Sequence, residues 1–297
     1  MLKPKDPWLL IDSNGICWEC KYGLKGLSFE GMETGIIFGF LNQVKKMAKL
    51  FSTRKFIFTW DSKKSIRRSL YPEYKRHRRD KMNDRTPQEI MEDNIAFSQF
   101  FQLRRFILPK FGFKNQLIRT GFESDDILAS LVIDTPKTMG DSRLIVASRD
   151  EDLYQLLNRC DIYNFHTGRL ITKQTFEEQH GINPLDWAMV KQIGGCTSDN
   201  VKGVPGVGED TAIRYIRKEL SKGKRLDTIT TLGDDIIKRN AMLVCLPLKG
   251  TEPEGGFNIQ EDVFGYNDFI DICEKYNFQS FLKKDSLGNW IKLFAMK

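Results

Sequence analysis

Histidine is scarce in this sequence, and it has no long apolar run. The 297 residues include three histidines: His77, His166 and His180. The six cysteines are scattered, with Cys17 and Cys20 the only close pair, so the ligands for a zinc site are too few. No segment approaches the roughly 18 consecutive apolar residues of a membrane span. Residues 1–8 lack the apolar core of a secretory signal, and we expect a cytosolic protein.

Repeats and low-complexity tracts are also missing. Hydrophobic residues make up 40% of the chain and charged residues 29%, which is typical of a globular protein and excludes a disordered one. A chain of this length buries enough surface to fold without disulfides, so the cysteines are expected to be free thiols.

Short apolar segments alternate with helical patterns over the first two-thirds of the chain. Strands are predicted over residues 8–12, 55–60, 113–118 and 143–147. Helices are predicted over 31–51, from Pro87 to about residue 106, and over 123–133. This alternation predicts an α/β fold with a mostly parallel central sheet covered by helices.

The pattern changes at about residue 182, after which helical stretches dominate. We predict an α/β domain over 1–181 and a helical region over 182–297. The run GVPGVG at 203–208 interrupts the helices. Its glycines would let backbone N–H groups approach a phosphate ahead of a helix N-terminus, although an ordinary Gly/Pro turn has the same composition.

Positive charge is concentrated in one segment. The net charge of the chain is +7, and residues 63–85 alone hold ten Lys or Arg and three Asp or Glu. A solvated basic loop is one interpretation. A phosphate-binding segment is the other, because clustered cations release counterions when they meet nucleic acid. Tyr71 and Tyr74 lie among these charges, and rings there could stack on unpaired bases.

Carboxylates gather at predicted strand ends and in the loops that follow. The set is Asp12, Asp61, Glu123, Asp125, Asp126, Asp150, Asp152 and Asp199. In open α/β sheets, ligands bind beyond the carboxyl ends of the strands. Taken singly, each acid has a structural explanation, such as a helix N-terminus or a turn. Together they would repel one another unless cations held them.

The chemistry of the set favours particular metals. Oxygen ligands without a His or Cys cluster favour Mg²⁺, with Mn²⁺ as the alternative. Two such ions roughly 4 Å apart can hydrolyse a phosphodiester, since one activates a water and the other stabilises the leaving oxygen.

The motifs also resemble a known family. In chain order they are LLID (9–12), FTWD (58–61), RR (67–68), YPEYKRHR (71–78), GFESDD (121–126), SRDEDL (148–153) and GCTSDNVKGVPGVG (195–208). Together they resemble the 5′-nuclease family, which includes bacteriophage and bacterial 5′→3′ exonucleases and flap endonucleases. The resemblance runs over roughly residues 8–220, and it implies the cytosol of a bacterium or of a phage-infected host.

This resemblance implies site residues and partners. It implies a helical arch over about 63–110 that admits a 5′ single strand. It also implies a helix-hairpin-helix at about 190–220 that grips duplex DNA and holds K⁺. The eight carboxylates would hold two divalent ions, and Lys75 and Arg78 would contact the scissile phosphate as catalytic cations. Further DNA contacts are assigned to Arg67, Arg68, Tyr74, Arg76, Gly203, Gly206, Gly208 and Arg214.

Three positions depart from the family pattern. Cys196 stands where an aspartate is usual. The second metal site therefore has one good ligand fewer, because a thiol is a poor ligand for Mg²⁺. Glu19 and Asp210 stand where basic residues are common, and Arg214, Arg217 and Lys218 compensate in part.

The sequence therefore predicts a metal-dependent 5′→3′ exonuclease or flap endonuclease that acts near 5′ ends of DNA, in replication or primer removal. We expect a monomer, with any polymerase partner as a separate chain. Two alternatives stay open. One is removal of RNA from RNA–DNA hybrids by the same fold, and the other is a branched-DNA binding module with impaired catalysis.

Overall fold

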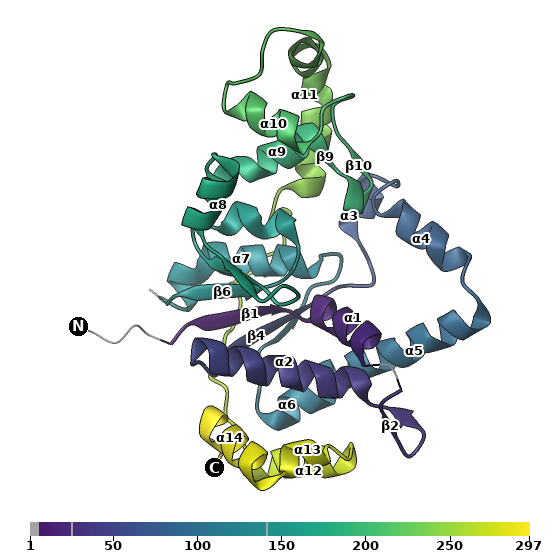
Figure 1. Ribbon diagram of the computed structural model, residues 1–297, viewed down its shortest axis with the longest axis vertical. Helices are drawn as coiled ribbons and strands as arrows, with labels where there is room; N and C mark the ends of the chain where they lie inside the picture. Colours follow the sequence, from purple (N-terminus) through teal and green to yellow (C-terminus); the bar gives the residue numbers. More distant parts are fainter. Residues whose placement is uncertain (1–5, 25, 141) are drawn as a thin grey trace.

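A six-stranded sheet forms the centre of the molecule. The computed structural model describes residues 6–24, 26–140 and 142–297 (Figure 1). Strand order is β5-β4-β1-β6-β7-β8, and every neighbouring pair is parallel except β7 and β8. The strands are β1 (Trp8–Asp12), β4 (Lys55–Trp60), β5 (Gln116–Ile118), β6 (Leu144–Ala147), β7 (Asp161–Asn164) and β8 (Arg169–Ile171). The predicted α/β fold with a mostly parallel sheet is confirmed.

Alternation along the strands builds one core on each face of the sheet. In β1, Leu9 and Ile11 face one core, and Trp8 and Leu10 face the other. The first core is covered by α1 (Ser13–Gly23), α2 (Gly35–Phe51), α5 (Pro87–Gln102) and α6 (Leu108–Phe111). The second core lies under α7 (Ser124–Thr138), α8 (Lys173–His180), α9 (Trp187–Gly194), α10 (Glu209–Ile216) and α11 (Lys224–Val244).

Helix boundaries differ from the predictions in two places. The helix predicted over 31–51 begins at Gly35, because the strands β2 (Ser28–Phe29) and β3 (Met32–Glu33) form a hairpin just before it. The helix that begins at Pro87 is capped by a reciprocal bond between Thr86 and Glu89. It passes the predicted end near residue 106 and continues through a π-helical turn (Leu103–Ile107) into α6.

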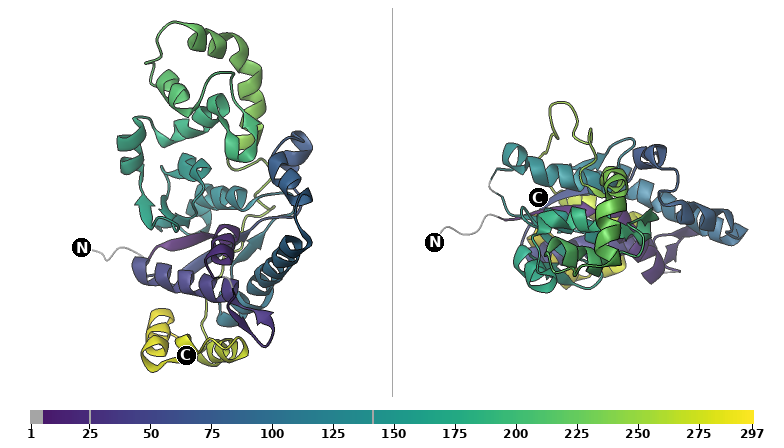
Figure 2. Two further views of the ribbon diagram at one scale, coloured as in Figure 1. Left: turned by 45° about the vertical axis from the view of Figure 1, so that its right-hand side comes forward. Right: turned by 90° about the horizontal axis from the view of Figure 1, so that it is seen from above.

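The basic segment forms an excursion from the sheet. After β4 the chain forms α3 (Ile66–Leu70) and α4 (Arg76–Asn83). It then extends away from the body of the molecule before α5 returns beside α1 and α2 (Figure 1). The view from above in Figure 2 shows the same excursion at the side of the molecule.

The C-terminal helices cross back to the sheet. They are α12 (Tyr266–Lys275), α13 (Gln279–Leu282) and α14 (Lys284–Phe294), and they join the core with α2 and β4. They lie at the opposite end of the molecule from α10 and α11 (Figure 2). The division at residues 181 and 182 therefore stays a prediction, and the segment after residue 264 packs with the sheet. Within the described part, no helix combines the length and apolar character needed to cross a membrane.

Candidate metal centre at the carboxyl edge of the sheet

The crevice of this sheet lies beyond the carboxyl ends of β1, β4 and β6. The chain passes from β1 to β4 on one side and later places β6 on the other side of β1. Connections leave in opposite directions at such a switch point, which opens a binding crevice. Asp12 ends β1, Asp61 follows β4, and Asp150 follows β6 closely. Topology thus brings three predicted carboxylates to one edge.

Local hydrogen bonds hold the first two of these acids in place. Asp12 caps α1, since its Oδ1 accepts from the Gly15 N–H at 3.0 Å. Its Oδ2 accepts from the Ser148 hydroxyl at 3.1 Å. A Cβ at position 15 would collide with this carboxylate, so glycine is required there. Asp61 Oδ1 accepts from the Ser124 N–H at 2.8 Å, which ties the end of β4 to the start of α7.

The surroundings of Asp125 indicate whether the residues of this edge could bind a metal ion. Its Oδ1 is buried and has no hydrogen-bond partner. Burial and the charges of Asp150 and Asp12 raise its pKa well above the ordinary value. Burial and the charge of Asp61 likewise raise the pKa of Asp12 to about 7. A buried oxygen without a donor, among mutually repelling carboxylates, fits a bound divalent cation.

A second acidic group lies beside the first. The ligand atoms of Asp152, Cys196 and Asp199 lie within 4.8 Å of one another, and no other trio of His, Cys, Asp or Glu in the described ranges meets this criterion. Burial and the charge of Asp150 raise the pKa of Asp152 to about 7. Lys191 Nζ lies 3.6 Å from Asp152 Oδ1, so part of the negative charge is already neutralised by protein.

Cys196 contributes a thiol to this group. Burial and the charges of Asp152 and Asp199 raise its pKa to about 12, so its sulfur stays protonated at neutral pH. The thiol donates to Asp152 Oδ2 at 3.5 Å, and its sulfur lies 3.1 Å from the Ser198 hydroxyl. A protonated, donating thiol does not ligate Mg²⁺, so the two carboxylates carry most of this second position.

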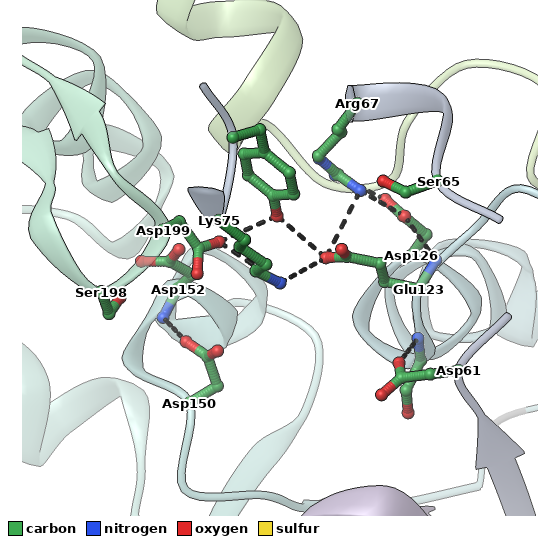
Figure 3. Close-up of polar contacts among 12 residues, drawn as sticks. Asp61, Ser65, Arg67, Lys75, Glu123, Asp126, Asp150, Asp152, Ser198 and Asp199 are labelled. Carbon is green, nitrogen blue, oxygen red and sulfur yellow. Dashed lines mark hydrogen bonds and ion pairs between the residues drawn. The ribbon is translucent and has the colours of Figure 1, made fainter. Parts of the chain in front are cut away.

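Two cations of the basic segment pair with acids of this edge: Lys75, which Figure 3 shows, and Arg78. Lys75 Nζ lies 2.8 Å from Glu123 Oε2 and 3.5 Å from Asp199 Oδ2. Arg78 donates to Asp199 Oδ1 at 2.9 Å and to the Ser198 carbonyl at 3.0 Å. Lys75 has a left-handed backbone with φ of 51°, and its N–H donates to the Asp199 carbonyl at 2.8 Å. Both predicted catalytic cations therefore lie at the acidic edge.

Asp126 does not face the crevice, which corrects its assignment as a metal ligand. Its side chain is fully buried and pairs with both terminal nitrogens of Arg67. It also accepts from the N–H groups of Glu123 at 3.1 Å and Leu248 at 2.9 Å. With its oxygens committed to four donors, Asp126 holds Arg67 in place and has no room for a metal.

Arg67 and Tyr74 are buried as well, which argues against their assignment as DNA contacts. Each is 2% exposed. Arg67 also donates to the Leu243 carbonyl at 2.8 Å. The Tyr74 hydroxyl lies 2.9 Å from Glu123 Oε2 and 2.8 Å from Asp199 Oδ2. These two side chains hold acids of this edge in place through hydrogen bonds and ion pairs. No sequence pattern indicated their burial.

Of the other predicted DNA contacts, Arg68 lies at the acidic edge, where it lines a pocket together with Asp61, Lys75 and Glu123. Arg68 and Arg76 belong to α3 and α4, and Arg76 pairs with Glu73 at 2.7 Å. Gly206 and Gly208 are exposed just before α10, and Arg214 is exposed in the last turn of that helix. Gly203 packs so closely on the Gly194 backbone that a Cβ would collide, so its role is in packing.

Glu19 and Asp210, the acids that stand where basic residues are common, lie in two different helices. Glu19 lies 3.4 Å from His166 in the α1 region. Asp210 lies in the first turn of α10, where a negative charge suits the helix dipole. Its neighbour Glu209 pairs with Lys191 at 2.9 Å, a link between α9 and α10 that the sequence did not predict.

Comparison with known proteins identifies the family to which the chain is similar. Residues 7–181 match the family model described as 5′-3′ exonuclease, N-terminal resolvase-like domain. The 5′-3′ exonuclease of Buchnera aphidicola subsp. Schizaphis graminum is 28% identical over 249 residues, which cover 82% of this chain and 81% of that protein. A thermostable DNA polymerase I of Thermus thermophilus is 29% identical over 220 residues, 73% of this chain but only 25% of the polymerase.

A solved structure shares the fold. The bacteriophage T5 D15 flap endonuclease, in a complex with DNA and metal ions, aligns with a TM-score of 0.67 and 23% identity. The alignment covers 81% of this chain and 89% of the phage protein.

Proposed function

Because this chain belongs to the 5′-3′ exonuclease family, we propose that it is a metal-dependent nuclease that cleaves phosphodiester bonds near the 5′ ends of DNA, including 5′ flaps. The observation that carries the proposal is the carboxyl edge. There Asp125 is near enough to Asp12, Asp61 and Asp150 to be affected by their charges, one of its oxygens lacks a hydrogen-bond partner, and Lys75 pairs with the neighbouring Glu123. The T5 protein whose fold this chain shares is a flap endonuclease in complex with DNA and metal ions, which supports this substrate class.

The carboxylates would hold two divalent ions, with Mg²⁺ preferred and Mn²⁺ as a substitute. Asp12, Asp61, Glu123, Asp125 and Asp150 would form one position, and Asp152 and Asp199 the core of the other. When bound, these ions supply Lewis acidity at the scissile phosphate. The protein fixes the acids through the Asp12 cap, the Asp61–Ser124 bond and the Tyr74 hydroxyl.

Lys75 and Arg78 would contact the scissile phosphate. At rest their charges are directed at Glu123 and Asp199. A phosphate that enters the crevice competes for the same donors, and the charge that develops in the transition state would strengthen these contacts. Burial of Lys75 opposes its charge, but the carboxylates of Glu123 and Asp199 keep its pKa above the ordinary value, so the ammonium stays charged.

The excursion over α3–α5 would meet the 5′ strand as an arch. It leaves the sheet directly beside the acidic edge and carries the basic segment (Figure 1). The glycine-rich run at 203–208, which follows the hairpin of β9 (Gly195–Cys196) and β10 (Val201–Lys202), and the start of α10 would bind duplex DNA, and K⁺ would bind there as well. We further propose that the enzyme acts as a monomer in the cytosol during replication or primer removal.

A cleavage assay tests the proposal. A 5′-flap duplex is incubated with the protein and Mg²⁺, and the products are sized. We expect cleavage near the flap junction that EDTA abolishes. Asp61→Ala should lose turnover but keep flap binding, whereas Glu261→Ala, at an exposed acid far from the edge in sequence, should cleave normally. Undiminished cleavage by Asp61→Ala would remove Asp61 from the site.

Two other functions are separated by the same assay. Removal of RNA from hybrids predicts faster cleavage of an RNA 5′ strand than of the matched DNA strand. A DNA-binding module with impaired catalysis is suggested by the protonated Cys196, and it predicts tight flap binding with no Mg²⁺-dependent product.

A further inference from the structure

A basic cavity lies at the edge of the sheet opposite the candidate metal centre. Its volume is about 800 Å³, and it lies between the C-terminal ends of α2 and α14. Arg54, which lines the cavity, immediately precedes β4, whereas Asp61 follows the other end of that strand. The length of the strand therefore separates this cavity from the catalytic edge, and DNA held at that edge does not explain it.

Four cations line the cavity, and one acid accompanies them. The cations are Lys45, Lys49, Arg54 and Lys292, and the acid is Asp6. None of the four cations forms an ion pair within the described ranges of the chain. Lys45 Nζ instead donates to the Ser286 hydroxyl at 3.2 Å and lies 4.8 Å from the centre of the Trp290 ring.

Helix ends explain only part of this charge. Lys49 and Lys292 lie in the last turns of α2 and α14, where a cation suits the helix dipole. Lys45 lies more than a turn before the end of α2, and Arg54 lies outside any helix. Burial and the charge of Lys49 lower the pKa of Lys45, so the cluster is held together against its own repulsion. An anion would relieve this repulsion.

The surroundings favour one class of anion. Both helices end beside the cavity, and the last carbonyls of a helix lack N–H partners within that helix. A nucleic-acid backbone has no donor to offer these carbonyls, whereas a peptide donates its N–H groups. None of the described lining residues is aromatic, so bases would find no ring on which to stack. Leu293 adds an apolar contact beside the charges.

We propose that this cavity binds an acidic peptide segment of a partner protein. Carboxylates of the segment would pair with Lys45, Lys49, Arg54 and Lys292, its backbone N–H groups would meet the helix carbonyls, and one apolar side chain would lie on Leu293. Such a partner would be held at the amino edge of the sheet and leave the catalytic edge open. The inference does not depend on the proposed nuclease function.

Fluorescence anisotropy with the full chain tests the proposal. The probe is a fluorescein-labelled ten-residue peptide of alternating Asp and Leu, at low salt. Lys49→Gln/Lys292→Gln should weaken binding about tenfold, as expected for loss of two partly exposed ion pairs. Lys46→Gln/Lys284→Gln is the matched control, because both lysines are exposed on the same helices but do not line the cavity. Binding should also weaken as salt increases.

Competition distinguishes the other ligands. Unlabelled peptide should displace the probe, whereas 10-mer oligo-dT and inorganic phosphate should not. Equal weakening in the control pair would overturn the proposal, as would no peptide binding. An oligo-dT affinity that falls in Lys49→Gln/Lys292→Gln but not in the control would assign the cavity to nucleic acid instead. Thermal unfolding checks each variant, and Arg54→Gln, outside both helices, repeats the test if the double variant unfolds.

Discussion

Two adjacent aspartates of α7 should respond to the same substitution in opposite directions. Asp126 is fully buried, and its oxygens accept from Arg67 and from the N–H groups of Glu123 and Leu248. Asp126→Asn removes the charge and turns an amide NH₂ toward these donors. Arg67, which is 2% exposed, would then be an unpaired cation in the interior. Asp125→Asn instead removes a carboxylate that repels its neighbours and has an oxygen without a donor.

The expected magnitude for Asp126→Asn follows from the burial of the pair. Removal of one partner of a buried ion pair costs about 3–5 kcal/mol. That is a large part of the roughly 5–15 kcal/mol that separates folded from unfolded states. The melting temperature should fall by about 5–8 °C. Asp125→Asn should raise the free energy of unfolding in EDTA, because fewer negative charges then share the edge.

Urea denaturation in EDTA, followed by tryptophan fluorescence, measures both changes. Repeating it with Mg²⁺ adds a second comparison, since an ion that binds only the folded state stabilises it. The native protein should gain stability with Mg²⁺, and Asp125→Asn should gain less. The reasoning is refuted if Asp126→Asn lies within about 0.5 kcal/mol of the native protein, or if Asp125→Asn is less stable than the native protein in EDTA.

Three further changes test the site. Lys75→Ala should lower the single-turnover cleavage rate about 10²–10³-fold with a smaller loss of binding; a loss confined to affinity would make Lys75 an ordinary phosphate contact. Cys196→Asp should shift the Mg²⁺ dependence of cleavage to lower concentration, with Mn²⁺ helping the native protein more than the variant; superimposable titrations would show that residue 196 does not tune the metal. Tyr74→Phe should lower the free energy of unfolding by about 1–3 kcal/mol, because Glu123 and Asp199 lose a buried donor, and an unchanged urea midpoint would contradict this.

The strands that carry the site are the part of the fold most visible in the sequence. β1 and β4 are continuous apolar runs, because parallel strands are covered on both faces, and each ends at a carboxylate. α1 was not predicted, since its helical start depends on the Asp12 cap and on the close fit of Gly15. The β7–β8 hairpin, at the sheet edge, carries too short a pattern to be recognised.

The site was predicted as a set of acids, but the sequence did not separate their roles. Successive helical residues point about 100° apart, so Asp125 and Asp126 could not both face one crevice. That spacing was a usable signal. No comparable signal marked Arg67 and Tyr74, which lie in a segment of high positive charge. Their burial depends on residues near 123, 199 and 243, and only the folded chain brings these together.

The return of the last three helices to the sheet has a consequence for how the protein is made. Trp290 and Phe294 of α14 pack on Phe111, and Phe294 also packs on Phe56 of β4. During synthesis on the ribosome, these aromatic side chains stay uncovered until residues 264–297 have been made. At the usual rate of translation, that segment takes roughly 2–7 s to synthesise. A fragment that ends at residue 181, where the family match ends, would leave the same face open permanently. Such a fragment should aggregate even though it carries most of the acidic residues.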